Sequence, residues 1–156
     1  MNRKQFSLFV ILLLMLMIFL CSCGDVIVEP KWIIGVKGAD SYYFSSIDYT
    51  KLREVTIVVE KEHHDGTVLE ETWKGIYFKD VLDYLEVAEY SSVTLSSYDD
   101  FAIEYSPEII NDSLTILATN VNGRDIKHED GYVQVVAGNQ TEDMWIKPLL
   151  KISVNK

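Results

Sequence analysis

The sequence predicts one α+β domain that is rich in strands and carries two or three short helices. Three observations lead to this fold class. After the first 22 residues, 134 of the 156 remain, a length that suits a single domain with a modest core. Short apolar segments alternate with turn residues along this part of the chain, as in strand-rich folds. One further segment has the apolar spacing of an amphipathic helix.

The N-terminus has the pattern of an export signal that ends at a lipid-modified cysteine. A short positive start, Asn2-Arg3-Lys4, precedes an apolar run from Phe6 to Leu20. At about 15 residues, this run is shorter than the roughly 20 that a membrane-spanning helix needs. The sequence Leu20-Cys21-Ser22-Cys23-Gly24 resembles the lipobox of bacterial lipoproteins. The resemblance implies a signal peptide (1–22), a tether (23–31) that starts at the acylated Cys23, and a folded domain (32–156).

Anchoring through the acyl chains on Cys23 would attach the protein to a lipid bilayer, at the outer face of the cytoplasmic membrane or of another cell-envelope membrane. Removal of Arg3 and Lys4 with the signal changes the formal charge from −10 to −12. Such a surface repels phosphate backbones, so we expect no nucleic-acid partner. Both cysteines, Cys21 and Cys23, lie in this N-terminal region. The folded domain therefore has no thiol for a disulfide, a nucleophile or a metal.

The first half of the domain is predicted to contain three strands and a short helix. The apolar segment Trp32–Val36 is closed by Lys37-Gly38. Ser46 can cap a helix that runs to about Leu52, because its hydroxyl can accept from an N–H group of the first turn. The segments Val55–Glu60 and Thr67–Trp73 flank Asp65-Gly66, which is typical of a hairpin turn.

The second half begins with the clearest helix, from about Ile76 to Leu85. Four large apolar residues share one face of it: Phe78, Val81, Leu82 and Leu85. The segments Val93–Ser97 and Phe101–Tyr105 predict a hairpin around Tyr98-Asp99-Asp100, and Ser106-Pro107-Glu108 then starts a helical turn. The remaining strands are predicted at Leu114–Asn120, Tyr132–Ala137 and Leu149–Val154.

Four short motifs occur in a characteristic order. They are Thr72-Trp73-Lys74-Gly75-Ile76 followed by Phe78-Lys79-Asp80-Val81-Leu82; Val121-Asn122-Gly123-Arg124-Asp125-Ile126; Gly131 to Gly138; and Trp145-Ile146-Lys147 with Leu150 to Val154. Together they resemble the oxidoreductase molybdopterin-binding domain of the sulfite oxidase family, over roughly Ile34 to Asn155. The resemblance implies a β-rich mixed-sheet domain with short helices.

In that family, molybdenum is held by a cysteine thiolate and two dithiolene sulfurs, and the cysteine follows the strand that here ends in Glu60-Lys61. Neither side chain supplies a soft thiolate. The family's strand arginine and the following proline are matched by Gln134 and Ala137. The resemblance therefore supports the fold and argues against the family's activity, so we expect no cofactor; the alternative is that molybdopterin binds through fewer contacts. The candidate pocket residues are Glu60, Lys61, His63, Trp73, Tyr132 and Gln134.

Other polar clusters are interpreted as surface structure, and no metal site is predicted. In His63-His64-Asp65, neighbouring strand residues point to opposite faces, so the two imidazoles do not easily share an ion. His128 with Glu129 and Asp130 fits a polar loop. The acidic pairs lack the staggered spacing of a calcium loop. Trp73 and Trp145, together with Tyr132, are candidates to line a pocket for a planar or sugar ligand, and packing in the core is the favoured interpretation.

Three functions stay open. The first is a non-catalytic binding or accessory domain for a small-molecule ligand or an envelope protein. The second is a divergent molybdopterin-dependent oxidoreductase, or a subunit of one, in which Lys61 or His63 supplies a proton. The third is a cell-surface module that engages a basic partner. An open, deep pocket at the end of Val55–Glu60, bordered by Lys61 and Gly131–Gly138, would favour a cofactor, and a filled one would oppose it.

Overall fold

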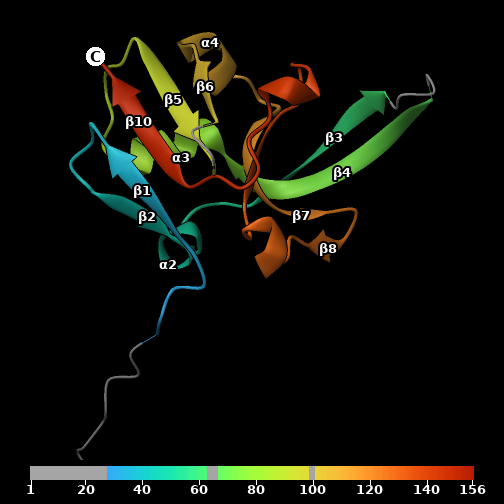
Figure 1. The fold of residues 1–156 in the computed structure, drawn as a ribbon, viewed down its shortest axis with the longest axis horizontal. Coiled ribbons are helices and arrows are strands. Elements are labelled where there is room, and N and C mark those ends of the chain that lie inside the picture. Colours follow the sequence, from blue (N-terminus) through green and yellow to red (C-terminus); the bar gives the residue numbers. More distant parts are fainter. Residues whose placement is uncertain (1–27, 63–66, 99–100) are drawn as a thin grey trace, which may run out of the picture.

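The protein folds into two β-sheets with short helices, which confirms the predicted α+β class (Figure 1). The computed structural model describes residues 28–62, 67–98 and 101–156. The predicted signal peptide, Cys23, His63, and the centre of each predicted hairpin turn (Asp65-Gly66 and Asp99-Asp100) lie outside these residues. No helix in the described ranges is long and apolar enough to cross a membrane.

The first sheet is mixed, as the family resemblance implies. Its strands lie in the order β2 (Tyr43–Ser45), β1 (Ile33–Lys37), β10 (Lys151–Asn155), β5 (Ser92–Ser96) and β6 (Ala102–Tyr105). Strands β1 and β10 are parallel, and all other pairs are antiparallel. Alternate residues such as Ile34, Leu95 and Ile152 are fully buried, because successive side chains of a strand point to opposite faces.

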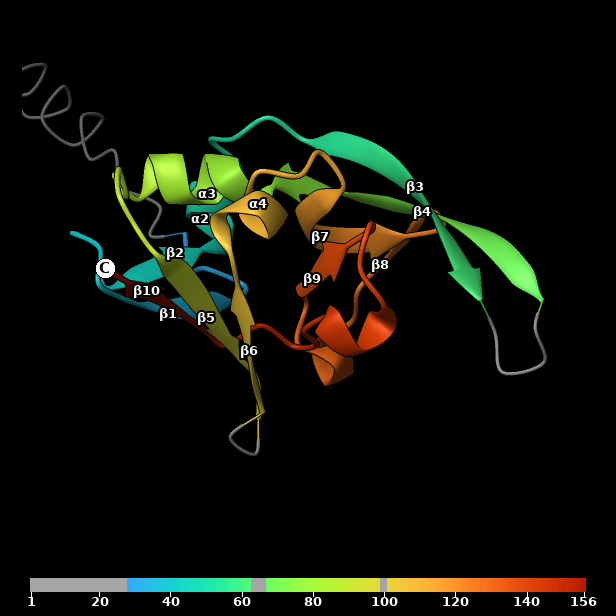
Figure 2. The same ribbon diagram turned by 90° about the horizontal axis from the view of Figure 1, so that it is seen from above.

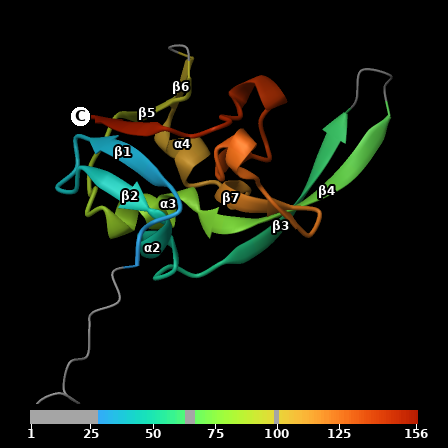
Figure 3. The same ribbon diagram turned by 60° about the horizontal axis from the view of Figure 1, so that its bottom comes forward.

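The second sheet is antiparallel and carries the cleft described below. Strands β3 (Val55–Glu62), β4 (Val68–Tyr77) and β7 (Thr115–Val121) are neighbours in that order. Along its other edge, β7 pairs through residues 115–118 with β9 (Gln134–Ala137) and through residues 120–121 with β8 (Arg124–Asp125). The ends of β3 and β4 extend beyond β7 as a two-stranded ribbon (Figures 2 and 3).

Helix α3 (Phe78–Tyr84) buries the predicted apolar face, with Phe78, Val81, Leu82 and Leu85 at most 2% exposed. It lies on the same side of the first sheet as the short helix α4 (Pro107–Ile110) (Figure 2). The helix begins two residues later than predicted because Ile76 and Tyr77 still pair with β7 as part of β4. In α4, Ser106 is the N-cap and Pro107 the first residue, as predicted.

Other boundaries differ from the sequence prediction for local reasons. Helix α2 (Ser46–Tyr49) is capped by Ser45 rather than Ser46. Asp48 Oδ2 accepts from the Ser45 N–H at 3.1 Å, and Ser45 Oγ accepts from the Asp48 N–H at 3.4 Å. Strand β9 starts at Gln134 instead of Tyr132, because Tyr132 has a left-handed φ of 65° that a strand does not contain. The two shortest strands, β2 and β8, were not predicted.

Gly75 allows β4 and β7 to approach closely. The pairing register shifts between Lys74 and Gly75, which marks a β-bulge. A Cβ atom at Gly75 would lie 2.7 Å from Ala118 Cα and 2.8 Å from the Leu117 carbonyl carbon, both main-chain atoms that cannot move aside. The glycine of the Trp-Lys-Gly motif is therefore required by backbone packing.

Candidate functional site

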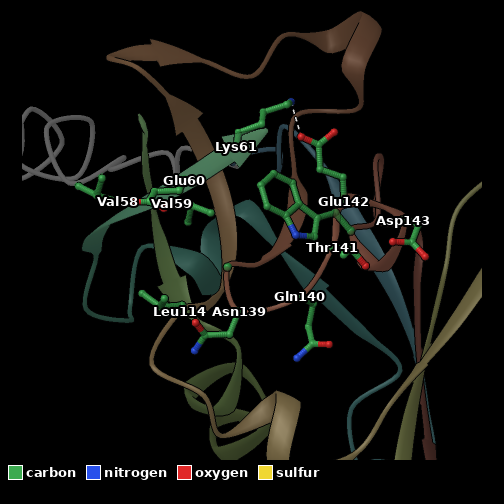
Figure 4. A pocket seen from close by; sticks show the side chains of 12 residues that line it. Val58, Val59, Glu60, Lys61, Leu114, Asn139, Gln140, Thr141, Glu142 and Asp143 are labelled. Atoms are coloured by element: carbon green, nitrogen blue, oxygen red, sulfur yellow. Dashed lines mark ion pairs between the residues drawn. The ribbon is translucent and has the colours of Figure 1, made fainter. Parts of the chain in front are cut away.

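A cavity of about 860 Å³ opens beside strand β3, and we call it the β3 cleft (Figure 4). One wall is formed by β3 itself and the other by the loop that follows β9, together with Leu114 and Trp145. The lining residues are Val58 to Lys61 on β3 and Gly138, Asn139, Gln140, Thr141, Glu142 and Asp143 in the loop. The cleft lies at the end of the predicted Val55–Glu60 strand, where the sequence alone could not predict whether a pocket is open or filled. It is open.

The strand period decides which β3 side chains face the cleft. Val59 is buried and Lys61 is partly buried, whereas Val58 and Glu60 are exposed. Figure 4 shows Lys61 reaching across to Glu142. The residues Glu71 and Trp73 of β4 lie on the same face as Val59 and Lys61, since β4 pairs with β3 in a regular antiparallel register.

Lys61 is the charged centre of this region. Its Nζ atom lies 3.0 Å from Glu142 Oε1 and 3.9 Å from Glu71 Oε1. It also lies 6.0 Å from the centroid of the Trp145 ring, at the outer range of a cation–π contact. The ion pair with Glu142 ties β3 to the short 3₁₀ helix η2 (Glu142–Met144). Lys61 is therefore neutralised by carboxylates from two separate parts of the chain.

A second, smaller cavity of about 380 Å³ adjoins the Lys61–Glu142 pair, and we call it the Trp73 pocket. Lys61, Glu142 and Trp145 line both cavities. The Trp73 pocket is also lined by Glu71, Trp73, Phe101, Val121, Gln134 and Lys147. Two buried polar atoms in it, Glu71 Oε2 and Trp73 Nε1, have no hydrogen-bond partner among the described residues.

The loop wall of the β3 cleft is held by contacts with the core. Trp145 packs edge-on against Trp73 at 5.6 Å between ring centroids, and its Nε1 donates to the carbonyl of Ala137 at 3.0 Å. Asn139 Nδ2 donates to Asp112 Oδ2 at 2.6 Å. The Tyr105 hydroxyl donates to the carbonyl of Met144 in η2. These bonds place the loop opposite β3.

The structure brings together four of the six candidate pocket residues. Glu60 and Lys61 line the β3 cleft, and Lys61, Trp73 and Gln134 line the Trp73 pocket. Tyr132 lines neither cavity; its ring packs against His128 at 5.3 Å. His63 lies outside the described residues, and so does the lipidation residue Cys23.

The sequence interpretation missed the acidic partners Glu71, Glu142 and Asp143. Glu70-Glu71 and Glu142-Asp143 were interpreted as solvated surface pairs, and nothing in either dipeptide distinguishes a carboxylate that faces a cavity. A correct β3–β4 register would have placed Glu71 beside Lys61. Trp145 was expected to pack in the core; it is 8% exposed and also lines both cavities.

Comparison with known proteins identifies the class of domain. The family model for the oxidoreductase molybdopterin binding domain matches residues 33–156, and the chain belongs to this family. A similar solved structure is the sulfane dehydrogenase SoxCD from Paracoccus pantotrophus, with a TM-score of 0.68 at 15% sequence identity. That similarity covers 82% of this chain and 40% of the SoxCD chain. No curated protein sequence matches the chain.

The residues of the two cavities do not fit a molybdenum centre of the family's kind. Lys61, which follows Glu60 near the position of the family's thiolate, points its ammonium group at Glu142 and Glu71. The described residues include no cysteine, and they contain no group of three His, Cys, Asp or Glu side chains that could hold a metal ion. Charge-assisted bonds from lysine or arginine strengthen phosphate binding, yet Lys61 is paired and Lys147 lies 2.7 Å from Asp130. The side-chain groups available to a ligand in the two cavities are carboxylates, amides and amines that are already paired with carboxylates.

Proposed function

We propose that this protein is a non-catalytic ligand-binding domain of the molybdopterin-binding-domain family, held at the outer surface of a membrane by lipid. One observation carries the proposal: the Lys61–Glu142 ion pair, 3.0 Å long, stands at the end of β3, where the family's metal ligand is expected. An ammonium group that is bound to carboxylates cannot replace a thiolate as a ligand of a soft metal.

The open β3 cleft supports ligand binding. A cavity of about 860 Å³ is within the range of small-molecule sites, which is roughly 300–1,000 Å³. An open pocket at this position is the feature that was expected to favour a cofactor. The side chains around it restrict the ligand to one that binds without a protein thiolate. The amides of Asn139 and Gln140 and the hydroxyl of Thr141 lie along one wall and supply neutral hydrogen-bonding groups.

A divergent oxidoreductase is the weaker alternative. The Glu60 side chain is exposed, and Lys61 is engaged by two carboxylates, so neither is a free group within the cleft. A proton-transfer role would require the release of Lys61 from Glu142. Fold and activity separate readily within a family, so membership alone does not carry the reaction over to this chain.

Metal analysis tests the proposal. Full-length protein purified from its native host is expected to contain less than stoichiometric molybdenum and tungsten when measured by mass spectrometry of the acid digest. A molybdoenzyme purified from the same cells serves as the control that the host supplies the cofactor. One molybdenum or tungsten atom per chain would contradict the non-catalytic assignment.

Lipid anchoring at Cys23 is a separate part of the proposal, and it is supported by the lipobox-like sequence Leu20 to Gly24. A cysteine with two acyl chains provides stable membrane attachment. Cells that express the wild-type chain are expected to incorporate labelled fatty acid into a membrane-bound protein that begins at Cys23. The Cys23→Ser variant should lose the label, and the matched Cys21→Ser variant should keep it. Equal labelling of both variants would refute this anchor.

A further inference from the structure

Strand β3 is an edge of the second sheet, and its unpaired main chain borders the β3 cleft. In the described part of the chain, β3 pairs with β4 and with no other strand. Val58 and Glu60 line the cleft although both side chains are exposed, and Figure 4 shows the Val58 side chain pointing away from the loop wall. Their contribution to the cavity is therefore largely main chain.

The hydrogen bonds of Thr72 show which main-chain groups of β3 are free. Thr72 N–H donates to Asn122 Oδ1 at 2.9 Å, and its carbonyl accepts from the Asn122 N–H at 2.7 Å, so both groups point away from β3. Val58 is directly opposite Thr72. In an antiparallel pair, such opposite residues direct their N–H and C=O groups to the outer edges. Val58 therefore presents both groups to the cleft, and Glu60 does the same because the orientation alternates.

The charge of the cleft is negative. The loop wall carries the carboxylates of Glu142 and Asp143, the exposed Glu60 carboxylate lies on the β3 edge, and the one lining cation, Lys61, is already paired. The whole chain carries a formal charge of −10. A second copy of the chain would bring another acidic edge against this one, whereas a basic partner would be attracted.

We infer that the β3 cleft binds an extended, basic peptide segment of a partner protein, which adds as a strand to the free edge of β3. The inference rests on the proposed function and names its ligand class. Strand addition uses main-chain hydrogen bonds for affinity and the side chains alongside for specificity. The four lining residues Val58 to Lys61 span about 13 Å at roughly 3.3 Å per residue, enough for a segment of about four residues.

In the bound state, the peptide main chain pairs with Val58 and Glu60. Its side chains alternate between the two faces of the ribbon. One set faces Trp145 and the polar loop residue Gln140, and the other set lies beside the exposed Val58 side chain. Lysine or arginine in the peptide meets the carboxylates of Glu142 and Asp143.

Peptide binding to the full-length chain in detergent tests the inference. The probe is a fluorescein-labelled hexapeptide of alternating valine and lysine, measured by fluorescence anisotropy. It is expected to bind, and to bind more weakly as salt rises. A valine–glutamate peptide and a valine–lysine peptide methylated at every main-chain nitrogen should each bind about tenfold more weakly or worse, because the first lacks the charge and the second lacks the donors. Equal binding of either control would overturn the inference.

Two variants of one residue separate the main chain from the side chain. Val58→Pro removes the outward N–H but no bond to β4, so binding should fall about tenfold while the circular dichroism spectrum is retained. Val58→Ala keeps the N–H and loses only side-chain contact with the peptide, so it should bind at least several-fold more tightly than Val58→Pro. Unchanged binding by a folded Val58→Pro variant contradicts strand addition. If this variant does not fold, the comparison of the methylated and unmethylated peptides on the wild-type chain still tests strand addition.

The remaining outcomes are distinct. A chain that dimerises in light scattering without peptide, and loses the dimer on Val58→Pro, would replace the peptide by a second copy and overturn the inference. If the purified chain contains no metal and binds none of the peptides, the inference of peptide binding is refuted and the non-catalytic proposal stands. Stoichiometric molybdenum would refute the non-catalytic proposal, whatever the peptides do.

Discussion

Replacement of Lys61 by methionine is the most informative single change at the site. Methionine keeps an unbranched apolar stem near Trp145 and removes only the ammonium group. The change leaves Glu142 and Glu71 without their cation. The two losses differ in size, because the Glu142 side chain is 50% exposed and the Glu71 side chain only 19%.

The expected destabilisation is about 2 kcal/mol. The half-exposed pair with Glu142 contributes about 0–1 kcal/mol, as surface ion pairs do. The larger part comes from Glu71, whose Oε2 atom is buried and has no hydrogen-bond partner among the described residues. Leaving such a carboxylate without its nearby cation costs about 1–3 kcal/mol.

Denaturant unfolding of the full chain in detergent measures this difference. Tryptophan fluorescence is a suitable probe because Trp73 and Trp145 both line the Trp73 pocket together with Lys61. The Lys61→Met variant should unfold at lower denaturant concentration with an unchanged slope, and its Tm should fall by about 7 °C. Glu142→Gln should lose about 1 kcal/mol or less.

A double variant isolates the buried carboxylate. Adding Glu71→Gln to Lys61→Met should restore about half of the lost stability, since a neutral amide is less costly to bury than an unpaired carboxylate. The reasoning is refuted if Glu142→Gln destabilises as much as Lys61→Met, or if Lys61→Met costs less than about 0.5 kcal/mol.

Two further predictions concern the fold. Gly75→Ala should destabilise the protein by about 3 kcal/mol in thermal unfolding, because its Cβ would lie 2.7 Å from Ala118 Cα; an unchanged Tm would contradict the close approach of β4 and β7. Burial raises the pKa of Asp48, but hydrogen bonds from Ser45, Lys51 and Tyr84 outweigh this and lower it from 3.8 to about 2. The folded state then holds fewer protons than the unfolded state, so about 1 kcal/mol of stability, after solvent screening, should be lost as pH falls from about 4 to 2. The free energy of unfolding of Asp48→Asn should change less than that of the wild type over this pH window. Parallel curves of unfolding free energy against pH would disprove the assignment.

Much of the fold was predictable because its signals are local. The apolar spacing of Phe78, Val81, Leu82 and Leu85 identified α3, and all four side chains are buried. Ser106-Pro107 marked the start of α4 correctly. The parallel pairing of β1 with β10 was not predictable from pattern, because it joins the two ends of the domain and no turn specifies its register.

The candidate site was predictable only in part. Lys61, Trp73 and Gln134 were identified from the family resemblance. The face of the sheet on which Glu71 lies depends on the β3–β4 register. A two-residue turn at Asp65-Gly66 would pair Lys61 with Glu70 and put Glu71 on the opposite face. The observed register pairs Lys61 with Leu69, so Glu71 shares its face.

Most of the strands and helices, their apolar faces, the acidic charge and the absence of any cysteine after Cys23 could be read from the sequence alone. These properties follow from composition and from short-range periodicity, which no tertiary contact changes. The tertiary structure decided that Lys61 is paired with Glu142 and that the main chain at Val58 faces an open cleft. Both depend on where the loop after β9 returns to β3, and that position is set by packing between segments far apart along the chain.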